Sequence, residues 1–210
     1  MFTGLVRHLG NLDARNTRPG GARLRISAPP ELLERAEQGA SICVNGACLT
    51  AVARDGRAFE ADLSEETLGK TTLGLLPLGT LLHLEPSLRV GDPLDGHLVS
   101  GHVDGIGQLL ERPEGEGIWR FAMPANLAPM TAPKGSMAVD GISLTVVEAG
   151  RDWFSVALIP ETVRRTRLET MRPGAEVNLE VDPIGRFVLR ALELRDGDER
   201  LARFATRGWE

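Results

Sequence analysis

The sequence has little aromatic or positively charged character. It contains no tyrosine, six phenylalanines and three tryptophans, so aromatic residues make up only 4% of its 210 positions. This scarcity argues against a stacking surface for single-stranded nucleic acid. The 24 Lys and Arg residues are outnumbered by 29 Asp and Glu, which gives a formal net charge of −5. Because a phosphate-binding surface favours the opposite balance, we expect no nucleic-acid partner.

Long apolar runs and cysteines are also scarce. No run approaches the length of a membrane span, and the opening MFTGLVRHLG lacks the charged and then apolar pattern of a secretory signal. The only cysteines are Cys43 and Cys48. On one shared strand their odd spacing would send the two side chains to opposite faces, which makes them a poor disulfide pair. Reduced thiols are the simpler interpretation, and they favour a cytoplasmic protein with no membrane partner.

The sequence does contain an internal repeat at an interval of 95 residues. Residues 41–52 align without gaps to residues 136–147, with 6 of 12 positions identical. The same interval aligns 65–73 with 160–168 and 82–85 with 177–180. Thr3-Gly-Leu also resembles Asp104-Gly-Ile, which suggests that each half opens with a similar strand. The 42% apolar content suffices for packed cores. We therefore expect two similar domains, residues 1–92 and 93–188, and a tail, residues 189–210.

Each half reads as short strands separated by turns. Asn45-Gly46 and Asp140-Gly141 are strong hairpin signals between β-rich runs. The expected strands are residues 41–44, 47–52, 57–63, 137–139, 142–147 and 153–158. The Glu-Thr blocks that follow could each start one short helix. Several short strands with few helices predict a small closed β-barrel in each half.

The tail is expected to form a helix over residues 184–194. Its apolar residues recur at helical spacing and form one stripe, made of Ile184, Phe187, Val188, Ala191 and Leu194. Asp196-Gly197-Asp198 should end or break this helix.

Eight blocks carry a more specific signal through their order and spacing. They are Met1-Phe-Thr-Gly-Leu-Val6, Val44-Asn-Gly-Ala-Cys-Leu-Thr50, Glu66-Thr-Leu68, Gly96-His-Leu-Val-Ser-Gly-His-Val-Asp-Gly105, Lys134-Gly135, Val139-Asp-Gly-Ile-Ser-Leu-Thr145, Ile159-Pro-Glu-Thr162 and Val177-Asn-Leu-Glu-Val-Asp-Pro183. Together they resemble the riboflavin synthase alpha-chain family, over residues 1 to about 195. His83 stands where that family usually has Asn, the residue found at Asn178 in the other half.

This resemblance implies a mostly β fold of two tandem six-stranded Greek-key barrels plus a C-terminal helix that assembles a homotrimer. It implies no metal and no organic cofactor, and lumazine synthase as a possible partner. The implied reaction dismutates two molecules of 6,7-dimethyl-8-ribityllumazine into riboflavin and 5-amino-6-(D-ribitylamino)uracil by transfer of a four-carbon unit. A duplicated fold suits this reaction, because two facing pockets would replace a bimolecular encounter with a positioned one.

The resemblance also implies the residues of both pockets. Those expected in the first are Gly4, Leu5, Val6, Cys48, Leu49, Thr50, Asp62, Leu63, Ser64, Glu65, Glu66, Thr67, Gly101, His102 and Val103. Those expected in the second are Lys134, Ser143, Leu144, Thr145, Ala157, Leu158, Ile159, Pro160, Glu161 and Thr162. His102 and Cys48 are the candidate catalytic residues, because their unperturbed pKa values lie closest to neutrality. Ser41, which is repeated as Ser136, is the third candidate.

Simpler interpretations stand beside these. Cys48 could be a small buried hydrophobe, and Lys134 a solvated surface charge. Thr67 and Thr162 could brace the short helices, while His97 is expected to be structural rather than a metal ligand. For the whole chain, the alternative is a non-catalytic protein of the same superfamily that holds lumazine or flavin. Both halves retain their Gly-x-x-Leu-Thr and Glu-Thr elements, which favours catalysis.

Overall fold

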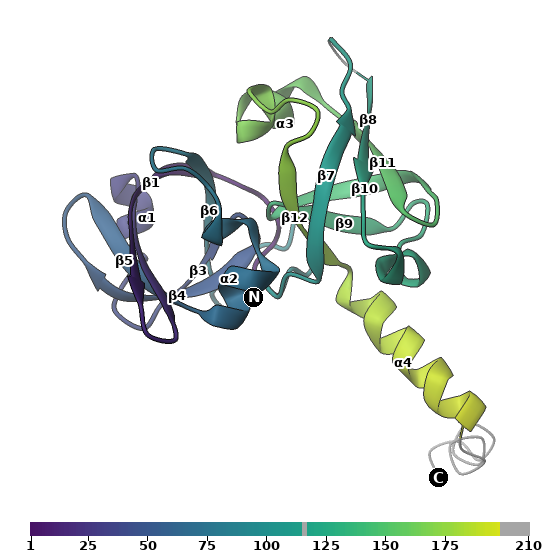
Figure 1. The fold of residues 1–210 in the computed structure, drawn as a ribbon, viewed down its shortest axis with the longest axis horizontal. Coiled ribbons are helices and arrows are strands. Elements are labelled where there is room, and N and C mark those ends of the chain that lie inside the picture. Colours follow the sequence, from purple (N-terminus) through teal and green to yellow (C-terminus); the bar gives the residue numbers. More distant parts are fainter. Residues whose placement is uncertain (115–116, 198–210) are drawn as a thin grey trace.

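The computed structural model describes residues 1–114 and 117–197, which form two closed antiparallel β-barrels and a C-terminal helix (Figure 1). The first barrel comprises β1 (His8–Arg18), β2 (Gly21–Ser27), β3 (Ser41–Val44), β4 (Ala47–Arg54), β5 (Ala58–Ser64) and β6 (Leu81–Pro86). The second comprises β7 (Gly105–Glu111), β8 (Gly117–Ala122), β9 (Ser136–Val139), β10 (Ile142–Ala149), β11 (Trp153–Leu158) and β12 (Glu176–Val181). The expected fold class is confirmed.

The two barrels share one topology. The strand order of the first is β1-β2-β5-β4-β3-β6, and the second follows the equivalent order. In each barrel three consecutive strands form a meander and an earlier strand pairs beside its last member, which is the Greek-key arrangement. Even the bulges repeat, since register shifts at Leu12/Ala14 and Ala51/Ala53 recur at Leu109/Glu111 and Val146/Glu148.

The central hairpin of each barrel turns where the sequence predicted. Asn45 and Gly46 both have positive φ, 43° and 84°, and Asp140 and Gly141 match them at 46° and 80°. Two consecutive left-handed residues are typical of a tight turn that follows the strand twist. The hairpin also corrects the assumption that the cysteines share a strand. Cys43 on β3 lies directly opposite Cys48 on β4, and both are free thiols.

Apolar side chains fill the inside of each barrel. Leu24, Phe59 and Leu82 are fully buried in the first. The second packs Trp119, Phe121 and Phe154 in a stack, with ring centroids 6.5 and 5.5 Å apart. Because residues on a strand alternate between the two faces, the polar positions beside these core residues lie on the outside of each barrel. Side chains therefore fill both barrel interiors and leave the outer surface for other contacts.

Short helices connect the strands. α2 (Glu65–Lys70) and α3 (Pro160–Arg164) begin in the Glu-Thr blocks, as predicted. The sequence did not predict α1 (Pro30–Leu33) or the 3-10 turns η1 (Thr72–Gly74), η2 (Ala125–Met130) and η3 (Arg167–Glu169).

The C-terminal helix α4 (Pro183–Gly197) extends away from both barrels (Figure 1). It continues through Asp196 and Gly197, two of the three residues expected to end it, while Asp198 and the rest of the predicted tail lie outside the described residues. No helix in the described ranges is both long and apolar enough to cross a bilayer.

The two barrels meet through paired contacts. Phe2 and Val99 form an antiparallel bridge, and the hairpin turns touch at Gly46 and Gly141. Asn178 of the second barrel accepts a hydrogen bond from Thr72 N at 2.8 Å and donates one to Asn45 O at 2.7 Å. His83 of the first barrel makes the matching contact to the second half, but with an imidazole ring. Its Nε2 accepts a hydrogen bond from Arg167 N at 2.9 Å. Its Nδ1 must then carry the proton and donate to Asp140 O, also at 2.9 Å.

Candidate functional site

Two glycine-containing segments cross between the barrels. Gly101 O, which precedes the second barrel, accepts a hydrogen bond from Cys48 N of the first barrel at 2.8 Å. Gly4 O, which precedes the first barrel, accepts one from Ser143 N of the second barrel at the same distance. Both glycines have positive φ, and a Cβ on either would lie 2.5 to 2.6 Å from the partner's Cβ. Each segment therefore lies directly against the strand of the opposite barrel.

The crossing places Gly4 and Val6 against the second barrel, whereas Gly4, Leu5 and Val6 were all expected in the first pocket. Gly4 packs against Ser143, and Val6 packs against the core of the second barrel. It also corrects the sequence alignment of the two openings. The hydrogen bonds match Thr3-Gly-Leu with Ser100-Gly-His, at an interval of 97 residues, and not with Asp104-Gly-Ile. His102 consequently stands where the other half has Leu5.

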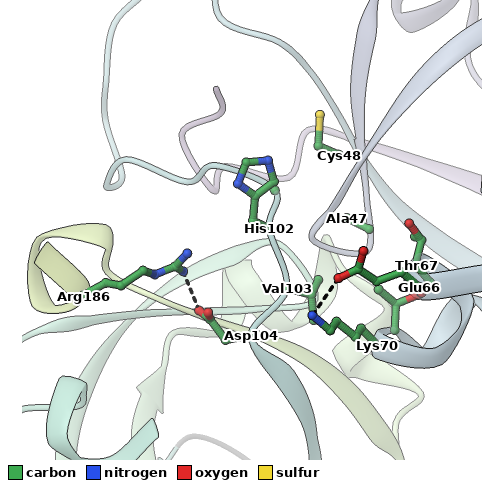
Figure 2. A pocket seen from close by; sticks show the side chains of 11 residues that line it. Ala47, Cys48, Glu66, Thr67, Lys70, His102, Val103, Asp104 and Arg186 are labelled. Carbon is green, nitrogen blue, oxygen red and sulfur yellow. Dashed lines mark hydrogen bonds and ion pairs between the residues drawn. The ribbon is translucent and has the colours of Figure 1, made fainter. Parts of the chain in front are cut away.

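A cavity of about 360 Å³ lies where the Gly101 segment meets the first barrel (Figure 2). It is lined by Ala47, Cys48, Glu66, Thr67, Lys70, Thr71, Gly101, His102, Val103, Asp104 and Arg186. We call this cavity the first site. It brings together residues from β4, α2, the segment before β7 and α4, which are far apart in the sequence. Six of its members, Cys48, Glu66, Thr67, Gly101, His102 and Val103, were expected in the first pocket.

The two main catalytic candidates both line the first site. Cys48 is half-buried on β4, and His102 is exposed on the Gly101 segment. Both side chains lie in the same part of the cavity wall in Figure 2. Ser41, the third candidate, pairs with Thr50 across β3 and β4 and is not among the residues that line this cavity.

Charged pairs form the remainder of the wall. Lys70 Nζ lies 2.8 Å from Glu66 Oε1, and this contact lowers the pKa of the Glu66 carboxyl. Arg186 reaches from α4 to Asp104 Oδ2, also at 2.8 Å. Lys70, Asp104 and Arg186 were not predicted as site residues. Two of them had a visible signal, because Lys70 follows Glu66 by four residues on an expected helix and Asp104 belongs to the Gly96–Gly105 block.

Several expected site residues have other roles. Asp62 lies on the outer face of β5, where Arg23 contacts both of its carboxylate oxygens at 2.6 Å and lowers its pKa. The Asp62 carboxylate therefore already has a charged partner, Arg23, on the neighbouring strand. Leu49, Leu63, Leu144 and Leu158 point into the barrel cores, which leaves only their backbones for a ligand. Ser64 caps α2 by accepting from Thr67 N at 3.1 Å, and exposed Glu65 follows it.

The residues around Ser143, the counterpart of Cys48, form the candidate second site. His97 Nδ1 lies 2.6 Å from Ser143 Oγ, and burial lowers the pKa of this histidine. His97 is 8% exposed, and its Nε2 has no partner among the described residues. From the sequence, His97 was expected to be structural. The neighbouring outward positions are Thr145, Ala157, Ile159 and Glu161, which are exposed, and Pro160 and Thr162, which are half-buried.

Lys134 and the two helix threonines also make local backbone contacts. Lys134 is exposed, has a φ of 70°, and donates its backbone N–H to Val146 O. The equivalent residue in the first half, Gly39, makes the same turn with Ala51 O. The carbonyls of Thr67 and Thr162 each accept a hydroxyl hydrogen bond at 2.7 Å from the threonine four residues later, which braces α2 and α3. No three His, Cys, Asp or Glu side chains in the described part of the chain gather closely enough to hold a metal ion.

Comparisons with known proteins agree with this architecture. The lumazine binding domain family matches residues 3–87 and again residues 100–182. The riboflavin synthase of Mycobacterium tuberculosis is 43% identical over 199 residues, which span 91% of this chain and 98% of that protein. The riboflavin synthase of Brucella abortus is 39% identical over 90% and 97% of the two chains, and that of Chlamydia trachomatis 40% over 87% and 89%.

Solved structures share the fold. The crystal structure of LumP complexed with riboflavin superposes with a TM-score of 0.79 at 24% identity, covering 86% of this chain and 99% of that one. LumP complexed with 6,7-dimethyl-8-(1'-D-ribityl) lumazine gives a TM-score of 0.77 at 23% identity over the same shares. Two copies of one domain model, together with relatives matched over nearly their whole length, show that the chain belongs to the riboflavin synthase family.

Proposed function

We propose that this protein catalyses the dismutation of two molecules of 6,7-dimethyl-8-ribityllumazine, the last step of riboflavin biosynthesis. One molecule donates a four-carbon unit and becomes 5-amino-6-(D-ribitylamino)uracil, and the other accepts the unit and becomes riboflavin. The two substrates contain all the atoms of the two products, so the balance needs no oxidant or reductant. The observation that carries the proposal is that two equivalent strand residues on one duplicated scaffold, Cys48 and Ser143, each contact a crossing segment and carry different polar side chains.

Different side chains suit the different tasks of the two substrates. The reaction requires proton abstraction from a 7-methyl group, addition to the partner molecule, ring opening and elimination. At the first site, Cys48 and His102 are positioned to accept or donate protons. At the second site the corresponding residues are Ser143 and Leu5, and His97 supplies the ionisable ring through its contact with Ser143 Oγ. The two sites therefore differ in which atom can hold a proton.

The proposed binding residues divide between the sites according to the crossing described above. Those lining or flanking the first site are Cys48, Leu49, Thr50, Asp62, Leu63, Ser64, Glu65, Glu66, Thr67, Gly101, His102 and Val103. Those at the second are Gly4, Leu5, Val6, Lys134, Ser143, Leu144, Thr145, Ala157, Leu158, Ile159, Pro160, Glu161 and Thr162. Ser41 remains a candidate that would act from the strand next to Thr50.

We further propose that the protein acts as a cytoplasmic homotrimer joined through α4, with lumazine synthase as a possible partner. The apolar stripe of α4 supports self-association, because Ile184, Phe187 and Val188 are 67%, 74% and 53% exposed. A stripe of this size on a helix that extends away from its own barrels is typical of an interface. Light scattering should give about three times the chain mass of 22.7 kDa, and Phe187→Glu should shift it to that of one chain. A single-chain mass for the unaltered protein would exclude the trimer.

The test of catalysis is to incubate the purified protein with the lumazine and no added cofactor, and to follow both products. We expect one riboflavin for every two lumazines consumed. His102→Gln and Cys48→Ser should each slow turnover, and His97→Gln should do so through the second site. Near-normal turnover in both first-site variants would remove those residues from the mechanism. Tight lumazine binding without any riboflavin would favour the non-catalytic binding protein instead.

A further inference from the structure

A buried glutamate holds each of the crossing segments. Glu180, on β12 of the second barrel, is 2% exposed. Its Oε1 accepts from Ser100 N at 2.7 Å and from Ser100 Oγ at 2.6 Å, and its Oε2 accepts from Gly101 N at 2.9 Å. Ser100 Oγ in turn accepts from His102 N at 3.2 Å. One carboxylate therefore organises three consecutive residues of the segment that carries His102.

Glu85, on β6 of the first barrel, makes the same set of contacts with the other segment. Its Oε1 accepts from Thr3 N at 2.7 Å and Thr3 Oγ1 at 2.8 Å, and its Oε2 accepts from Gly4 N at 3.1 Å. Thr3 Oγ1 then accepts from Leu5 N at 3.0 Å. The same four hydrogen bonds therefore occur in both halves, with a buried glutamate carboxylate as the acceptor of three of them in each.

Each glutamate thereby acts on a strand of the opposite barrel. Glu180 holds Gly101, whose carbonyl binds Cys48 N, and a Cβ at Gly101 would lie 2.5 Å from Cys48 Cβ. The segment that Glu180 binds is therefore in direct contact with Cys48. Glu85 holds Gly4, which lies against Ser143 in the same way. A carboxylate fits this task because its two oxygens accept several bonds at once and charge-assisted bonds are the stronger kind.

We propose that Glu180 is a positioning residue for the first site and Glu85 for the second, so that each barrel holds the segment that completes the site on the other barrel. The proposal rests on the proposed function only for the identification of the two sites as substrate sites. The bonding pattern itself is independent of it.

The alternative is a purely local role, and the strand register makes the two distinguishable. Within the first barrel Glu85 pairs with Cys43, which pairs with Cys48. A glutamate that only stabilised its own sheet would therefore affect Cys48 from two strands away. Glu180 likewise pairs with Ala138, which pairs with Ser143. The local and crossed roles predict opposite partners for each glutamate.

The experiment measures how fast a thiol at each site reacts with iodoacetamide in the full-length protein. Cys48 is the natural probe of the first site, and Ser143→Cys in a Cys48→Ser background places a probe at the second. Glu180→Ala should accelerate alkylation of Cys48 by about tenfold, because three hydrogen bonds to a charged group are lost, and leave the probe at position 143 within about twofold. Glu85→Ala should give the reverse pattern.

Glu180→Gln and Glu85→Gln are the conservative variants. Each keeps one carbonyl oxygen as an acceptor, so each should rescue most of the change while leaving the crossed pattern visible. They also keep the test decisive if an alanine variant fails to fold. A local pattern, in which Glu85 variants expose Cys48 and Glu180 variants expose position 143, would overturn the proposal. Equal acceleration at both positions would do so too. Because alkylation needs no turnover, these outcomes are separate from a failure of the proposed function.

Discussion

Replacing Asp140 by alanine should weaken the second barrel more than the matching change weakens the first. The Asp140 carboxylate is fully buried and accepts from Asn178 N at 2.8 Å. Its other oxygen lies 2.7 Å from Arg167 Nη2. In the first half, Asn45 accepts from His83 N at 2.7 Å in the equivalent way, without a charged partner. The two positions therefore differ by one ion pair.

The magnitude follows from what each substitution leaves unpaired. Removing one partner of a buried ion pair costs about 3–5 kcal/mol, and the lower end applies because the Arg167 side chain keeps 12% exposure. Removing a neutral acceptor from a buried backbone N–H costs about 1–3 kcal/mol. We therefore expect Asp140→Ala to lose ~1–2 kcal/mol more unfolding free energy than Asn45→Ala. Asp140→Asn should fall between them, because it restores the acceptor without the charge.

Urea unfolding followed by tryptophan fluorescence suits this comparison. Trp119 and Trp153, two of the three tryptophans, lie on strands of the second barrel, so in a Trp209→Phe background the signal reports on the barrel that contains Asp140. Circular dichroism in the same titration monitors both barrels. Should Asp140→Ala prove no more destabilising than Asn45→Ala, the ion pair with Arg167 would have no net value, and the reasoning from burial would be wrong.

Three further predictions concern His83, Gly101 and Cys48. Burial lowers the pKa of the His83 imidazole from its ordinary 6.5 to about 4. As the pH falls from 6.5 towards 4, the unfolded chain therefore binds a proton that the folded protein does not, and the free energy of unfolding should fall. His83→Asn should flatten this pH dependence in urea titrations. Gly101→Ala should weaken lumazine binding at the first site in a fluorescence titration, because its φ is +82° and its Cβ would collide with Cys48; unchanged affinity would contradict the tight contact. Iodoacetamide should label Cys48 well before Cys43, whose thiol pKa is raised well above its usual value by burial, and equal labelling measured by mass spectrometry would refute this order.

Local patterns in the sequence predicted much of the fold. Asn45-Gly46 and Asp140-Gly141 predicted both central hairpins, and the period of apolar residues after Pro183 predicted α4. These features depend on neighbouring residues, so local sequence patterns could reveal them. The many short strands predicted a closed barrel in each half, whereas the six-stranded Greek-key order depends on long-range pairing and was inferred through family resemblance.

The site was less predictable because its geometry depends on contacts between the halves. The interval of 95 residues that aligns the hairpins does not align the crossing segments, where Gly4 matches Gly101 at an interval of 97. Gly4 therefore lies against the second barrel, although it was expected beside the first. His97 belongs to the Gly96–Gly105 block, but nothing in that block distinguished a site histidine from a packed one. Arg186 reaches the first site from a helix whose apolar face was its only recognisable feature.

The exchanged openings also bear on how such a chain could have arisen. In a single half on its own, the opening segment would have no strand of another barrel to pack against, and the strand that such a segment covers would be exposed. Two copies of that half could exchange their opening segments across a twofold axis. Joining them end to end would keep the swap while freeing each copy to change, as the thiol at position 48 and the hydroxyl at 143 illustrate.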